Sequence, residues 1–441
     1  MSDDYPGAPQ SIESARAAIR ALNGTVNAVI EESPVPAGQP DGRAIPVLLK
    51  DCMDVRGLRT SFGSALYATA PPAATDATVT ARLRARRAAV IGKANLTEFC
   101  FGATGQNDHY GNCRNPWDTS RITGGSSSGS AAAVASGMVR IALGTDTGGS
   151  VRIPAALCGV IGLRPTVGRV PNTGCLAVST ISDTIGPLAA TVAEACWAFD
   201  AIQGYDADDP LSIPAGPATL PTLHDGIAGF SVGVLGGFYA ENLAPEIESA
   251  IGEVARLLER QGARLSDIAP VNNDALREHH AFRFILADVA EARAALMADP
   301  EKRAAIGAEV RRRIELGQAV TGTEYAASIR ALLALKQWLR SVFDSGVDLL
   351  LLPTTPVTAP RWQDAGDMVE TTRLVSRFTY DLGASGVPSV SVPMGLERHG
   401  LPMGAMLAAP WGEEARLLRA AQAVEQALAL QARPPHYADS N

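Results

Sequence analysis

Short apolar runs that alternate with helical segments constrain the fold of this chain most strongly. Residues 44–49 and 88–92 are apolar stretches of strand length, and residues 77–87 between them have a helical pattern. Asp76 is the expected N-cap of that helix. Because strand–helix–strand order is typical of sheets layered with helices, we expect an α/β protein.

The same criteria predict the remaining elements. Further strands are expected at residues 139–144, 347–353 and 387–393, the last with prolines only at its ends, and further helices at 11–23, 131–136 and 412–430. Residues 282–343 are rich in Ala, Arg, Glu and Leu at helical spacing, and we expect several helices there. No linker is evident. We therefore expect residues 1–441 to form one domain with a helical insertion at about 282–343.

Composition excludes several classes of protein. The net charge of −8 argues against a nucleic-acid or anionic-membrane partner. No secretory signal and no apolar run of about 18 residues is visible. The six cysteines are scattered without a CxxC pair, which predicts reduced thiols and neither a zinc site nor a disulfide framework. These features predict a cytoplasmic protein.

A Gly/Ser-rich block at residues 124–150 could supply a nucleophile. It follows a long stretch without periodicity, and such stretches are usually functional or disordered. Ser150 comes directly after Thr147-Gly148-Gly149. Glycines allow consecutive N–H groups to point at one place, where they could hold an oxyanion beside an attacking serine.

The nucleophile needs a base, and Lys50 is the candidate. None of the six histidines lies in or beside the block, whereas Lys50 ends an apolar run whose burial would favour a neutral amine. Ser126 could relay a proton between Lys50 and Ser150. A purely structural role for the block and a surface position for Lys50 stay open at this point. Gly/Ser stretches are more often turns or linkers, and most lysines lie on the surface.

The ordered motifs of the chain resemble the amidase signature family. The main match is residues 124–165, which contain GGSSSGS and GTDTGGS. Further segments match in order, among them IPVLLKDCMDVRGL, GKANLTEF, YGNCRNPWD, SDTIGPLA, LLLPTTP and GVPSVSVPMG. The resemblance covers about residues 45–407. It implies the family's fold, a large mixed β-sheet sandwiched between layers of α-helices.

The resemblance also implies a Ser–cis-Ser–Lys triad. Ser150 matches the nucleophile, Ser126 the relay after a cis Gly125–Ser126 peptide, and Lys50 the base. The implied oxyanion donors are the backbone N–H groups of Thr147, Gly148, Gly149 and Ser150.

The same resemblance implies supporting roles for residues near the triad. Ser127 is expected to hydrogen-bond within the triad, and Asp146 and Arg152 are expected to brace the loop. Cys100 and Phe101 fall where relatives line the acyl pocket, although both could equally be core residues.

The implied activity is hydrolysis of a small-molecule carboxamide to a carboxylate plus ammonia or an amine, through a seryl acyl-enzyme and without a metal or organic cofactor. Two alternatives remain: the A subunit of a tRNA-dependent amidotransferase, which releases ammonia from glutamine for a partner, and a non-catalytic ligand-binding relative. A homodimer is left open. The substrate is not named by the sequence, and residues 282–343 are expected to choose it.

Overall fold

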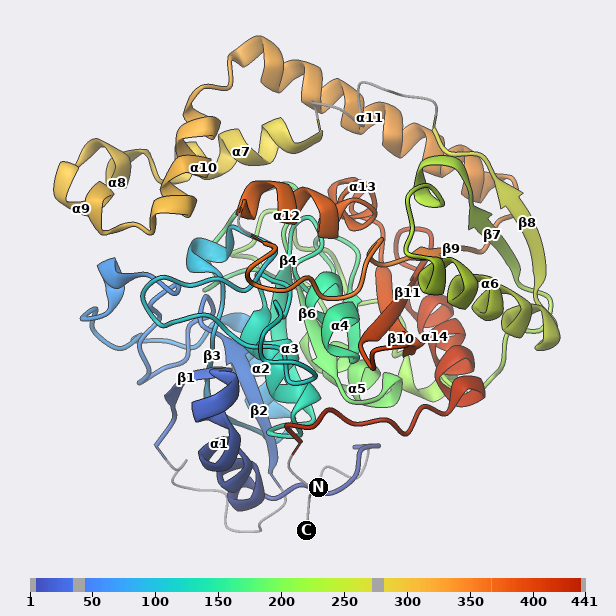
Figure 1. Ribbon diagram of the computed structural model, residues 1–441, viewed down its shortest axis with the longest axis horizontal. Coiled ribbons are helices and arrows are strands. Elements are labelled where there is room, and N and C mark those ends of the chain that lie inside the picture. Colours follow the sequence, from blue (N-terminus) through green and yellow to red (C-terminus); the bar gives the residue numbers. More distant parts are fainter. Residues whose placement is uncertain (1–4, 35–43, 272–280, 366, 438–441) are drawn as a thin grey trace.

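One mixed β-sheet forms the centre of the molecule. The computed structural model describes residues 5–34, 44–271, 281–365 and 367–437 (Figure 1). Within these ranges the sheet has eleven strands in the order β1-β3-β2-β4-β6-β5-β10-β11-β9-β7-β8. The strands are β1 Val29–Glu32, β2 Ile45–Lys50, β3 Ala88–Ala94, β4 Ile141–Asp146, β5 Ile161–Arg164, β6 Thr184–Ala189, β7 Ser231–Leu235, β8 Arg264–Ile268, β9 Leu349–Pro353, β10 Ser389–Leu396 and β11 Pro402–Ala408.

Helices cover the sheet and extend beyond it. The α-helices are α1 Ile12–Val26, α2 Thr78–Ala85, α3 Ser128–Ala135, α4 Arg152–Cys158, α5 Val192–Ile202, α6 Pro245–Arg260, α7 Ala281–Ala292, α8 Ala294–Ala298, α9 Pro300–Ala305, α10 Ala308–Gln318, α11 Gly322–Asp344, α12 Met368–Ser376, α13 Thr379–Ser385 and α14 Glu414–Leu428. Short 3-10 helices lie at η1 Ala65–Tyr67, η2 Glu98–Cys100, η3 Leu220–Thr222 and η4 Gly237–Tyr239. None of the helices in these described ranges combines the length and apolarity needed to cross a membrane.

Strand β2 shows why both faces of the sheet must be covered. Val47 and Leu49 pack in one hydrophobic cluster, whereas Leu48 between them packs in another. Successive side chains of a strand point to opposite faces, so an uninterrupted apolar strand needs an apolar layer on each side. Helices α1, α3 and α4 supply one layer, and α2, α5, α6 and α14 contribute to the other. The predicted α/β sandwich is confirmed.

Three predictions from local sequence patterns are wrong: the end of α1, the N-cap of α2 and the position of the prolines in β10. Helix α1 does not end at Asn23-Gly24, because it continues to Val26 and Asn27 closes it in a left-handed conformation (φ 57°) with its N–H bonded to the Asn23 carbonyl. Asp76 does not cap α2, since its carboxylate accepts the Arg56 N–H (2.7 Å) and the cap position is Ala77.

The third feature is the proline of strand β10. Pro393 lies inside this strand rather than at its end, and the register against β11 shifts between Pro393 and Gly395. A bulge of this kind accommodates a residue that has no N–H to give to the ladder.

Helices α7 to α11 occupy residues 281–344 and lie together at one side of the molecule, at the top of Figure 1. Helix α7 packs against α10 and α11, and α11 also packs against α13. The helices predicted for residues 282–343 are therefore present where the structure describes this region. The extent of the domain stays a prediction.

Candidate active site

Two neighbouring parallel strands bring Lys50 to the Gly/Ser block. Lys50 is the last residue of β2, which pairs in parallel with β4. Strand β4 ends at Asp146 and leads through residues 147–151 into α4. The carboxyl ends of parallel strands meet at one edge of a sheet, which is where such proteins commonly place their sites.

Lys50 is fully buried and bonded to two hydroxyl groups. Its Nζ lies 2.7 Å from Ser126 Oγ and 2.6 Å from Thr145 Oγ1. In the described part of the chain no carboxylate lies within ion-pair distance of it. By contrast Lys93, on adjacent strand β3, is also fully buried but forms an ion pair with Asp51 (2.9 Å).

A backbone hydrogen bond joins the segment of Ser126 to that of Ser150. The Gly125–Ser126 peptide is cis, as the family resemblance implies. The N–H of Ser127 donates to the Ser150 carbonyl (3.2 Å). The Ser127 hydroxyl exchanges hydrogen bonds with the backbone of Thr145 (both 3.2 Å), so this side chain joins α3 to β4. In the part of the chain that the structure describes, it forms no hydrogen bond with the side chains of Lys50, Ser126 or Ser150, where a bond had been expected.

A buried ion cluster braces the loop that carries Ser150. Arg152 donates to Asp146 through Nε and Nη2 (3.0 Å each), and Arg164 from β5 adds a third contact at 3.0 Å. Burial alone would raise the pKa of Asp146, but the two guanidiniums hold it well below its usual range. The carboxylate also accepts the N–H groups of Gly149 (2.8 Å) and Val151 (3.1 Å).

This bracing changes the set of N–H groups that remain available to hold an oxyanion. The Gly149 N–H is bonded to Asp146, whereas those of Thr147, Gly148 and Ser150 have no acceptor among the described residues. Gly149 instead has a conformational role. Its φ of 135° disfavours other residues, and a Cβ there would lie 2.2 Å from Thr379 Oγ1.

A cavity of about 60 Å³ opens beside Ser150. Both Cys100 and Phe101, expected at the acyl pocket, line it. Burial raises the pKa of the Cys100 thiol well above its usual value, so this cysteine is a neutral wall residue. The other lining residues are Gly102 and Ala103 after η2, Thr147, Gly148 and Ser150 of the loop, Ile153 of α4, Val178 between β5 and β6, Ile285 of α7, Arg313 of α10, Thr372 and Ser376 of α12, and Tyr380 of α13.

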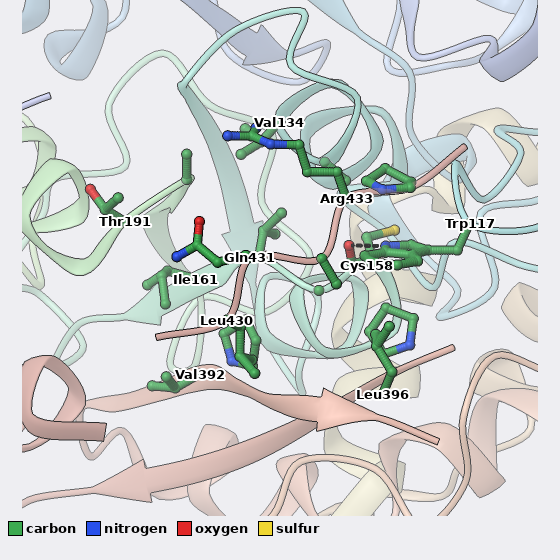
Figure 2. Close-up of a pocket in the computed structure, with 18 of the residues that line it drawn as sticks. Trp117, Val134, Cys158, Ile161, Thr191, Val392, Leu396, Leu430, Gln431 and Arg433 are labelled. Carbon is green, nitrogen blue, oxygen red and sulfur yellow. Dashed lines mark hydrogen bonds between the residues drawn. The ribbon is translucent and has the colours of Figure 1, made fainter. Parts of the chain in front are cut away.

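A larger cavity of about 270 Å³ lies elsewhere, beneath the C-terminal segment that follows α14. Figure 2 shows Trp117, Thr191, Gln431 and Arg433 around it. None of Lys50, Ser126 and Ser150 lines this cavity, and its Cys158 is buried with a pKa raised well above the usual value. It therefore lacks the chemistry of the smaller site. In the described residues, no three His, Cys, Asp or Glu side chains gather as a metal site would require.

Sequence reasoning missed three polar residues of this site. Thr145 is the second partner of Lys50, Arg164 completes the ion cluster, and Asp183 accepts the Thr147 hydroxyl (2.5 Å). The strand alternation of β4 could have indicated Thr145. Arg164 and Asp183 reach the loop from β5 and from the turn before β6, and no local pattern indicates that.

Comparison with known proteins shows the family of the chain. The sequence profile of the family described as Amidase matches residues 11–418. The chain belongs to the amidase signature family. Enzymes of this family are hydrolases that act on amides.

Among curated relatives, the chain is similar to the A subunits of glutamyl-tRNA(Gln) amidotransferases. It is 36% identical over 416 residues to that of Syntrophus aciditrophicus (strain SB), covering 89% of this chain and 85% of the relative. It is 38% identical over 409 residues to that of Thermus thermophilus, covering 87% and 84%.

Solved structures of other family members share the fold. One chain from an inhibitor-bound vestigial protein complex related to an s-triazine catabolic enzyme has a TM-score of 0.87 and 32% identity, covering 96% of this chain and 95% of that one. A bacterial aryl acylamidase has a TM-score of 0.83 and 26% identity, covering 94% and 92%.

Proposed function

We propose that the protein hydrolyses a linear, small-molecule carboxamide through a seryl acyl-enzyme. The observation that carries this proposal is the buried Lys50, whose Nζ lies 2.7 Å from Ser126 Oγ beside the loop of Ser150. An amine that bonds hydroxyl groups and has no carboxylate partner is suited to accept a proton.

In the proposed reaction, Lys50 accepts the proton of Ser126 while Ser126 takes that of Ser150. Ser150 Oγ then attacks the amide carbonyl carbon, and the oxyanion is held by N–H groups of the 147–150 loop. Thr147, Gly148 and Ser150 are the favoured donors, since Asp146 occupies the Gly149 N–H. The proton returns through Ser126 to the leaving nitrogen as the C–N bond breaks. Water then releases the acyl group by the same route.

The polar surroundings support this assignment. Thr145 Oγ1 gives Lys50 a second partner (2.6 Å), which fixes the direction of the amine. The ion cluster of Asp146, Arg152 and Arg164 fixes the loop before any substrate arrives. A loop that is already fixed holds its N–H donors in position, so they can stabilise the developing oxyanion without first being reoriented.

The proposal is tested by replacing Ser150 with alanine. Ammonia release from a panel of aliphatic and aryl amides should fall by a factor of about 10⁴ or more in Ser150→Ala, because removal of the nucleophile ends covalent catalysis. Ser120→Ala, which alters an exposed serine bonded to Asp118, is the matched control and should keep full activity. Full activity in Ser150→Ala would overturn the mechanism.

A second candidate function is favoured by the curated relatives, which are the A subunits of amidotransferases. In that case the chain would release ammonia from glutamine for a partner. The purified chain alone should hydrolyse simple amides if the first proposal holds. Turnover of glutamine only, and only after partner proteins are added, would favour the second. Binding of amides without any turnover would indicate a non-catalytic relative.

We also infer a reducing compartment such as the cytoplasm. All six cysteines are free, and five of them are buried. Free thiols persist in such compartments, whereas extracellular proteins commonly pair them.

A further inference from the structure

The larger cavity, beneath the C-terminal segment, lies at the end of β4 away from Ser150. Arg140 lines this cavity and directly precedes β4, whereas Asp146 ends the strand and leads to the loop of Ser150. Thr191, also in the wall, follows β6, which runs antiparallel to β4. Six residues of strand span roughly 20 Å. A molecule bound in this cavity would therefore be remote from the proposed nucleophile.

One part of the cavity wall is apolar and open to solvent. Val392 and Leu396 of β10, Leu428 of α14 and Leu430 of the C-terminal segment line it (Figure 2). Leu396 and Leu430 keep 39% and 45% of their surface exposed. An aliphatic chain in the cavity, whose volume is about 270 Å³, would cover this apolar surface, and removal of apolar surface from water favours binding.

Arg140 offers the cavity a hydrogen-bond donor without a net charge. Its Nε and Nη2 donate to the Glu194 carboxylate, which also accepts the hydroxyls of Tyr5 (2.8 Å) and Thr191 (2.9 Å). Its Nη1 has no acceptor among the described residues. Because Glu194 already balances the guanidinium, Nη1 suits a neutral carbonyl oxygen and does not require an anion.

Glu425 and Gln431 offer the same cavity hydrogen-bond acceptors. The Glu425 carboxylate accepts the Val192 N–H (2.9 Å) and the Gln422 amide (3.2 Å), one on each oxygen, and burial raises its pKa to about 7. The Gln431 amide donates to the Ala429 carbonyl (3.2 Å) and points into the cavity (Figure 2). Each of these oxygens can accept a further bond. Convergent polar groups beside an apolar wall are typical of ligand sites.

We propose that this cavity is a second, non-catalytic site that binds a primary carboxamide carrying a short aliphatic chain. The carboxamide carbonyl accepts from Arg140, its two N–H groups face Glu425 and Gln431, and its chain lies against the apolar wall. A carboxylate is a poorer match, because it has no donor and its charge would meet that of Glu425. The inference goes beyond the proposed hydrolysis, since no residue of the triad lines this cavity and no bond is broken there.

The first test measures which end group binds. Calorimetry in the Ser150→Ala background prevents turnover, and a pH of about 8 keeps Glu425 ionised. Affinity should rise about 4-fold per added methylene from butanamide to hexanamide. N,N-dimethylhexanamide should bind at least about 10-fold more weakly than hexanamide, because it has lost both N–H donors. Equal binding of the dimethyl amide, or tighter binding of hexanoate, would overturn the assignment of the end group.

The second test places the bound amide. Ala190 is exposed and lines the cavity, so Ala190→Phe should fill its mouth and weaken hexanamide binding at least about 10-fold. Ala218→Phe, at an exposed alanine away from the cavity, is the matched control and should bind as before. Gln431→Leu should also weaken binding, whereas Gln426→Leu, outside the cavity, should not.

Hydrogen exchange completes the test. Hexanamide should slow exchange at the amides of residues 430–433 in Ser150→Ala and should no longer do so after Ala190→Phe. Protection only around residues 147–150, or full binding in Ala190→Phe, would overturn the second site. Hydrolysis by Ala190→Phe in the unaltered background should remain complete, because the site is not catalytic. Loss of the dependence on Ser150 would instead overturn the proposed function.

Discussion

The loop at residues 124–152 and the helices α7 to α11 both reach the candidate cavity, but they are built differently. In the loop, the buried charges are paired, because Asp146 lies between Arg152 and Arg164. In the helical region, Arg313 is buried against the Phe101 ring and forms no ion pair with a described carboxylate, although the charge of Glu309 acts on it. The loop is therefore held by its own ion pairs, whereas the helical region places a cation in the cavity wall that is held by an aromatic ring and one backbone carbonyl.

The largest expected effects come from two buried lysines, Lys50 beside the loop and Lys93 on the next strand, which are proposed to serve catalysis and stability respectively. Lys50→Met should lower kcat/KM by about 10³-fold or more while the fold remains, because it removes the proposed base. Lys93→Met should instead lower the free energy of unfolding by about 3 to 5 kcal/mol, because it leaves Asp51 buried without its partner. Amide assays and urea unfolding separate the two effects. A stable, inactive Lys93→Met beside an active Lys50→Met would exchange their roles.

The ion cluster of the loop gives the next largest effect. Asp146→Ala should cost about 3 to 5 kcal/mol of unfolding free energy, since it leaves two buried guanidiniums without a carboxylate. Lys302→Ala removes an exposed ion pair with Asp299 in the helical region and should leave stability unchanged. Urea unfolding of both variants checks this. Equal losses would show that the two regions are not built differently.

The sequence predicted the fold class and the position of the serine-containing loop, but it did not predict the contribution of the helical region to the cavity. The short apolar runs that became β2 and β3, with α2 between them, indicated an α/β fold, and the contiguous Gly/Ser block indicated where Ser126 and Ser150 lie. Arg313 could not be found in this way. It meets Phe101 across 212 residues of chain, and which turn of α10 faces the cavity depends on tertiary packing.

Asp183 predicts a pH dependence of stability on the loop side. Burial raises the pKa of Asp183 to about 6 in the folded chain, whereas the unfolded chain has the ordinary value near 3.8. Folding therefore favours the protonated carboxyl, and its contribution is fully present below about pH 4 and is lost as the pH rises through 6, by about 3 kcal/mol at most.

The variant Asp183→Asn resembles the protonated carboxyl and should remove this dependence. Its amide oxygen can accept the Val178 and Ser179 N–H groups, and its NH₂ can donate to Thr147 Oγ1. The stability of Asp183→Asn relative to the unaltered chain should then be higher at pH 7 than at pH 4. Calorimetric melting at both pH values measures this, and the same difference at both would contradict the assignment.

The smallest effect compares one kind of helix cap in the two regions. The Ser11 hydroxyl accepts the Ser14 N–H (2.9 Å) at the start of α1, and the Asp299 carboxylate accepts the N–H groups of Glu301 (3.0 Å) and Lys302 (3.2 Å) at the start of α9. Helix α1 buries Ala15, Ala18, Ile19 and Val26 against the sheet, whereas α9 buries none of its residues.

Loss of a cap lowers global stability only where the helix is coupled to the core. Ser11→Ala should therefore cost about 1 kcal/mol in urea unfolding. Asp299→Ala should leave the global transition in place and instead speed hydrogen exchange at the amides of α9, since exposed elements open locally without unfolding the rest. If Asp299→Ala shifted the global transition as much as Ser11→Ala, the helical region would be as tightly coupled to the sheet as α1.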